Sequence, residues 1–388
     1  MNRATLFVLL GGFALTVAFI FAPGADQSGP FVPRSDADVL EEVPKSTPRP
    51  TAPLTVDEAA ARARQLIDEA RKAGGDPRLL GRAQATLAPW WADASPPPQI
   101  RILRATLKQS FHDFEGALVD LEAQVTADPA DAQAWLTRAT VLSVLARYPE
   151  AQVSCEKLAG LSSPVVVAVC RAQVMGLTGR AKEATTLLES LTPSTEERGW
   201  MLSVLGELAH WSGDDTRAEA ALSQALSIDP TDTYSRLLLA QVLLDGGQPS
   251  RAAKLFEGRA VNDGELLMQV LALSAAKSPE YDAKRAELDE RVAANRQRGE
   301  TLHQREESRY ALALEGDVNQ ALELAVKNWA VQKEPADARV LLEAAAAAKD
   351  EKAAGPVVQW LAQTNFTQPK LHQLSPSPRG GEGRGEGP

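Results

Sequence analysis

The chain has 388 residues, and 41 lysines and arginines against 51 aspartates and glutamates give it a formal net charge of −10. A negative chain repels phosphate backbones and anionic lipid surfaces, so we expect no nucleic acid partner. Aromatic residues make up only 5% of the chain, while strong helix formers are abundant, which excludes a typical sheet protein and favours helices.

The N-terminal segment is apolar. Residues 4–22 carry no charge, follow Arg3 and precede Asp26 and Asp36, a pattern that predicts an export signal. Two fates stay open: residues 1–22 are either a signal anchor that holds the protein in a bacterial inner membrane through residues 4–22, or a signal peptide that is cleaved. In both cases we expect the rest of the chain in the periplasm.

Residues 23–54 are rich in proline and poor in large apolar side chains, so they predict a disordered linker. Thr55 and Glu58 then have the spacing of a capping box, which starts the folded part. The pattern predicts a first helix over about 56–73 that ends at Gly74 and Gly75, and a second helix that opens at Pro77.

Small residues recur from there on with a period of 33 to 35 residues. One series is Ala83, Ala117, Ala151, Ala184, Ala218, Ala252, Ala286 and Ala321. The members of a second series each lie twelve residues before a member of the first, at Ala105, Ala139, Ala172, Gly206 and Ala240. Two small residues in each period indicate a pair of helices, because the backbones of crossing helices approach closely only where the side chains are small.

Turn residues keep the same period. Gly179, Gly213 and Gly247 each lie five residues before an alanine of the first series, and Asp229-Pro230 follows a second helix. With these residues in place, the segment 217–230 resembles the second helix of a tetratricopeptide repeat. The resemblance covers about 98–265 well and 64–97 and 266–364 loosely. It implies an all-α superhelix, or solenoid, over residues 55–364.

The pattern changes towards the C-terminus. Around 278–298 the inter-helix glycine is missing and the charged run predicts one long exposed helix, in which Ala286 belongs to the series by coincidence. A last pair is expected at about 336–348 and 351–364, although Pro356 is unfavourable inside a helix. Residues 365–388 are expected to be a disordered tail.

The resemblance also implies where a partner would bind. The first helix of each repeat lines a concave face, and its ligand-facing positions form a polar strip with aromatic residues. We expect this strip to hold a protein or peptide client. Its residues are Thr140, Gln173, Trp200, Glu207, His210, Trp211, Tyr234, Gln241 and Asp245. Because the strip has no lysine or arginine at the positions that clamp a C-terminal carboxylate in this family, no carboxylate-clamp ligand is expected.

Cys155 and Cys170, the two cysteines of the chain, fall on neighbouring helices. They form either a disulfide or two buried thiols. The four histidines are dispersed, so we expect no metal site, and the chain lacks the motifs of nucleotide binding or nucleophilic catalysis. No cofactor is expected.

These observations predict a protein–protein interaction scaffold of the bacterial cell envelope. The alternative is an assembly or maturation chaperone for a membrane or periplasmic enzyme complex. An enzyme that uses Glu207 and Asp245 as an acid pair ranks last, since such pairs more often belong to a solvated face.

Overall fold

The structure is a computed structural model that describes residues 53–72, 75–259, 261–297 and 304–376. The expected signal segment 1–22, nearly all of the expected linker 23–54 and the last twelve residues lie outside the described residues. Among the described helices, none combines the length and the apolar character that crossing a bilayer would require.

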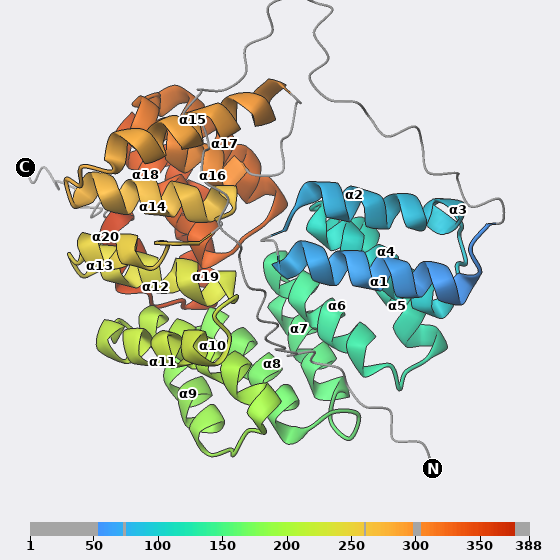
Figure 1. The fold of residues 1–388 in the computed structure, drawn as a ribbon. Coiled ribbons are helices and arrows are strands. Elements are labelled where there is room, and N and C mark those ends of the chain that lie inside the picture. Colours follow the sequence, from blue (N-terminus) through green and yellow to red (C-terminus); the bar gives the residue numbers. More distant parts are fainter. Residues whose placement is uncertain (1–52, 73–74, 260, 298–303, 377–388) are drawn as a thin grey trace, which may run out of the picture.

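Helices follow one another throughout the described part of the chain, which contains no strand (Figure 1). They are α1 (Val56–Lys72), α2 (Pro77–Thr86), α3 (Ala88–Trp91), α4 (Pro98–Ser110), α5 (Phe114–Ala127), α6 (Ala132–Val144), α7 (Tyr148–Lys157), α8 (Pro164–Leu177), α9 (Ala181–Glu189), α10 (Thr195–Trp211), α11 (Asp215–Ile228), α12 (Thr233–Asp245), α13 (Pro249–Lys254), α14 (Asp263–Ala275), α15 (Tyr281–Gln297), α16 (Gln304–Tyr310), the π-helical turn η1 (Ala311–Glu315), α17 (Val318–Val331), α18 (Pro335–Ala348), α19 (Glu351–Thr364) and α20 (Pro369–Leu374).

The small residues of the first series lie where the helices cross. All of them are fully buried except Ala286, which is exposed on α15. That helix is continuous, as its charged sequence predicts, and α19 forms across Pro356. The period of the sequence therefore marks real contacts between helices, and it lapses only at Ala286 on the long helix α15.

The turns between paired helices use the left-handed region of backbone space. Gly179, Gly213 and Gly247 have φ values of 77°, 79° and 69°, so the predicted role of these glycines is confirmed. His112 and Ala146 occupy the same position in the two preceding repeats and adopt φ values of 59° and 58° although they carry a Cβ. The repeat imposes this turn whether or not glycine is present.

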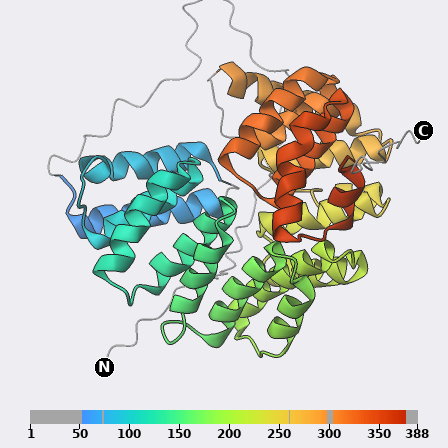
Figure 2. The same cartoon turned by 180° about the vertical axis from the view of Figure 1, so that it is seen from behind.

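The array curves until its C-terminal helices meet its first half (Figure 2). The indole nitrogen of Trp360 in α19 donates to the hydroxyl of Tyr148 in α7 over 2.9 Å, and the backbone nitrogen of Lys333 donates to the carbonyl of Val144 over 2.8 Å. One hydrophobic core accordingly runs from Ala105 in α4 through to residues of α18–α20.

The expectation of a disordered tail over 365–388 is wrong for its first twelve residues. Residues 365–376 are described, and they include the short helix α20. Phe366 and Leu371 are both buried. The ring of Phe366 packs edge-on against Trp211 of α10, with ring centres 5.3 Å apart, so it is covered by a helix that precedes it by more than 150 residues.

Candidate partner-binding groove

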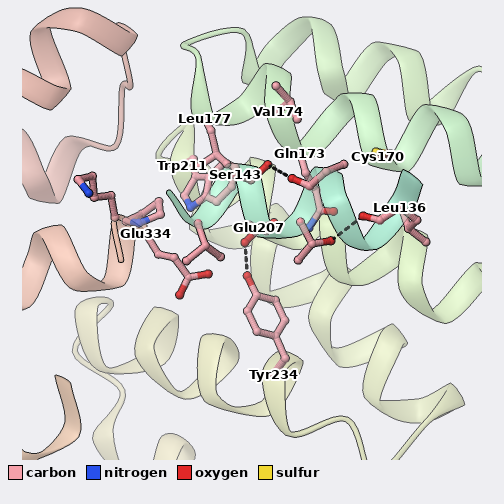
Figure 3. Close-up of a pocket in the computed structure, with 15 residues that line it drawn as sticks. Leu136, Ser143, Cys170, Gln173, Val174, Leu177, Glu207, Trp211, Tyr234 and Glu334 are labelled. Atoms are coloured by element: carbon pink, nitrogen blue, oxygen red, sulfur yellow. Dashed lines mark hydrogen bonds between the residues drawn. The ribbon is translucent and has the colours of Figure 1, made fainter. Parts of the chain in front are cut away.

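A cavity of about 140 Å³ lies on the concave side, between α6, α8, α10 and the segment that leads into α18 (Figure 3). Five residues of the predicted strip line it, namely Thr140, Gln173, Glu207, Trp211 and Tyr234. Each of the helices α6, α8, α10 and α12 supplies at least one of them. The repeat therefore brings together residues from positions 140 to 234, as its period predicts.

Glu207 lies on α10 at a point where this helix packs closely against α11. The preceding residue, Gly206, has no side chain, and a Cβ there would come within 2.6 Å of the side chain of Leu222. A Ser194–Glu197 capping box starts α10 and fixes its first turn. The close packing of this helix pair sets the position of the Glu207 backbone, and its side chain lines the cavity.

The carboxylate of Glu207 is only partly satisfied. Glu207 is only 7% exposed, and its Oε1 accepts a hydrogen bond from the hydroxyl of Tyr234. Its Oε2 is buried and has no hydrogen-bond partner within the part of the chain that the structure describes. Burial raises the pKa of Glu207 to about 7, against the lowering effect of the Tyr234 hydroxyl and of the nearby Gln173 amide, and the charge of Glu334 adds to the rise.

The rest of the predicted strip is covered by the C-terminal half of the chain. Asp245 pairs with Arg339 of α18 through two bonds of 2.6 and 2.8 Å. Gln241 accepts from Arg309 over 3.0 Å, and the Nε2 of His210 lies 2.8 Å from the amide of Gln368. These residues are contacts within the molecule and not an open surface.

Trp200 and Trp211 also pack inside the molecule. Trp200 is half-buried beside the main core, and Trp211 is buried against Phe366. Tyr234 differs, since 52% of its surface is exposed while its hydroxyl remains bonded to Glu207. The accessible part of the strip is therefore the region around Thr140, Gln173 and Tyr234.

Glu334 and Lys333 were not among the predicted site residues, yet both line the cavity. They come from the loop before α18, far from Thr140 in the sequence. Glu334 accepts a 3.2 Å hydrogen bond from Arg305, which also approaches the buried Asp337. Burial and the charge of Asp337 raise the pKa of Glu334, and Arg305 opposes this. No local pattern in the sequence could have identified this loop, because its position depends on the curvature of the array.

Cys155 of α7 and Cys170 of α8 are joined by a disulfide, with Cα atoms 5.6 Å apart. The sequence left the choice between a bridge and two thiols open. Cys170 also lines the cavity, so the bridge ties down one of its walls. No group of three histidine, cysteine, aspartate or glutamate side chains able to hold a metal ion is found within the described ranges.

These features define a class: an array of helix pairs whose concave side carries a cavity with both polar and apolar walls. Residues 212–288 match the sequence profile of the tetratricopeptide repeat. This segment is similar to the tetratricopeptide repeat, and the small-residue series carry the same period on both sides of it.

Three similar proteins illustrate the relationship. Cellulose synthase operon protein C of Pseudomonas fluorescens (strain SBW25) is 32% identical over 93 residues, which are 22% of this chain and only 7% of that protein. The type IV pilus biogenesis factor PilW is 19% identical, with a TM-score of 0.41 over 50% of this chain and 94% of its own. A thermophilic tetratricopeptide protein of Thermus thermophilus is 18% identical, with a TM-score of 0.39 over 48% of this chain and 98% of its own.

Proposed function

We propose that this protein is a protein–protein interaction scaffold that binds a peptide or loop of a partner at the concave side, around Thr140 and Tyr234. The half-exposed ring of Tyr234 at the edge of the cavity is the observation that carries the proposal. Aromatic side chains with one polar end are typical anchors of protein interfaces. The tetratricopeptide match over residues 212–288 supports it, because such arrays present extended concave surfaces for binding.

Site-specific photo-crosslinking tests this proposal. A crosslinking amino acid at Thr140, which is exposed on α6, should capture a partner in living cells, and the Tyr234→Ala variant should lose it. The control position is Val119, which is 66% exposed on the second helix of its repeat. Equal capture from positions 140 and 119, or full recovery with Tyr234→Ala, would refute the proposal.

We further propose that the scaffold works in the bacterial envelope, on the periplasmic side of the inner membrane. The uncharged residues 4–22 after Arg3 support this location. A phosphatase reporter fused after residue 376 should be active outside the cytoplasm, and an inactive reporter would contradict the location. The identity of the crosslinked partner then separates a passive scaffold from an assembly chaperone for an enzyme complex.

A further inference from the structure

We propose that the cavity at Glu207 receives the ammonium group of a lysine side chain from the bound segment, which rests on the function proposed above. The buried Oε2 of Glu207, for which the described residues offer no partner, carries the inference. An unpaired carboxylate oxygen in a buried site costs free energy that a positively charged donor would recover. The ligand would thus complete a hydrogen-bond set that the free protein leaves incomplete.

The charges around the cavity favour a cation. Glu207 and Glu334 both line it, and the charge of each carboxylate is disfavoured by burial. Two basic side chains are near: Lys333 lines the cavity, and Arg305 is engaged with Glu334 and Asp337. Neither base pairs with Glu207 among the described residues, because its Oε1 is bonded to Tyr234 and its Oε2 has no partner.

The shape of the site favours lysine over arginine. Oε1 of Glu207 is already bonded to Tyr234, so a single oxygen of the carboxylate is free. A guanidinium prefers two parallel acceptors, whereas an ammonium is a compact point charge that one oxygen can hold. Leu136, Val174 and Leu177 line the same cavity and would cover the four methylene groups of a lysine.

Calorimetric titration of the full chain with n-butylammonium chloride tests the inference. We expect it to bind at least tenfold more tightly than 1-butanol, its neutral analogue, and more tightly than n-propylguanidinium. Since the pKa of Glu207 is about 7, binding at pH 7 should release about half a proton, and affinity should rise from pH 6 to pH 8. Equal binding of butylammonium and butanol, or binding without proton release, would overturn the inference.

Variants locate the effect. Glu207→Gln should weaken butylammonium binding at least tenfold, and Tyr234→Phe should retain it, because that change leaves the carboxylate in place. Glu183→Gln, at an exposed ion pair with Arg180 on the outer side, is the matched control and should bind as the wild type does. Unchanged binding by a folded Glu207→Gln variant would refute the site, and if that variant does not fold, the proton release of the wild type decides.

The outcomes separate this inference from the proposed function. If Tyr234→Ala loses the crosslinked partner while butylammonium and butanol bind equally, the docking surface stands and the lysine site is wrong. If butylammonium binds selectively but Tyr234→Ala still captures the partner, the lysine site stands and the proposed docking surface is wrong. A peptide with a central lysine, compared with its norleucine analogue, should show the same preference as the small probes.

Discussion

Burial governs the chemistry of single residues in this protein, and Glu207 shows it most clearly. The carboxylate lies in a site where it has one hydrogen-bonded oxygen and one bare oxygen. Its charged form is therefore disfavoured, and its pKa rises from 4.5 to about 7. In the unfolded chain the same group would return to its ordinary pKa.

This difference predicts a pH dependence of stability. Between pH 4.5 and pH 7 the folded state binds more protons at Glu207 than the unfolded state does, so this residue's contribution to stability is present at low pH and is lost as the pH rises through 7. The loss amounts to about 3 kcal/mol. Urea denaturation at pH 5 and pH 8 should give the free energy of unfolding of the wild type and of Glu207→Gln. We expect the difference between the two proteins to change with pH, and a difference that is independent of pH would contradict the prediction.

The left-handed turn residues allow a second prediction at this scale. Ala146 adopts a φ of 58°, which costs a residue with a Cβ about 1 kcal/mol, so Ala146→Gly should raise the free energy of unfolding by up to about 1 kcal/mol. Gly247→Ala is the converse test, since a Cβ there would meet no atom within 4 Å and only the backbone would be strained. Chemical denaturation should show that Ala146→Gly raises the free energy of unfolding and that Gly247→Ala lowers it. Changes of the same sign would rule out the backbone explanation.

At the scale of elements, short segments become ordered through the helices they meet. The segment after α19 has six residues in its helix, too few to be stable alone. It is held by Phe366, whose ring packs against Trp211 and Trp360, and by Gln368 at His210. The sequence does not predict that this segment is ordered, because it contains few apolar residues.

Phe366→Ala should therefore lower the free energy of unfolding by about 3 to 5 kcal/mol, the usual cost of truncating a buried phenylalanine. Thr367→Ala, at the exposed neighbour, should change it by less than about 0.5 kcal/mol. Hydrogen exchange should also become faster across α20 in the first variant. Similar stability of the two variants would show that the segment does not pack as described.

The bridge between α7 and α8 is a second feature of this scale. It closes a loop with a sequence separation of 15, and a loop of this length should contribute about 3 kcal/mol by restricting the unfolded chain. Denaturation with and without a reductant should show this difference, and a variant with both cysteines replaced by alanine should not respond. Equal electrophoretic mobility with and without reductant after thiol blocking would show that the bridge is absent.

At the scale of the whole molecule, the curvature of the array brings helices that are distant in sequence into contact. Asp245 of α12 and Arg339 of α18 are 94 residues apart in sequence, and both are largely buried where they pair. Breaking a buried ion pair leaves a charge without its partner, which typically costs about 3 to 5 kcal/mol. This ion pair covers a part of the concave side that the sequence analysis expects to be accessible to a partner.

Asp245→Arg should therefore open the array, because it places two positive charges side by side in a buried position. We expect a larger radius of gyration in small-angle X-ray scattering and a lower melting temperature. Glu323→Arg, at an exposed pair with Lys327, is the matched control and should change neither value. An unchanged radius for Asp245→Arg, together with an unchanged melting temperature, would contradict the closed arrangement.

The residues alone determined the repeat. The buried alanines, the turn glycines and the lapse around Ala286 are local or periodic features, and each helix pair contacts mainly its neighbours in the chain. The resemblance to the tetratricopeptide repeat implied that Thr140, Gln173, Glu207 and Tyr234 would share one face, and they line one cavity.

Only the tertiary structure decided which part of that face stays accessible. The small rotation between successive helix pairs adds up over the array, and no single pair encodes the sum. This sum brings Arg339 onto Asp245 and Gln368 onto His210, and it places Glu334 beside the cavity at Glu207. Contacts between residues so far apart depend on accumulated geometry and have no signature in the sequence around them.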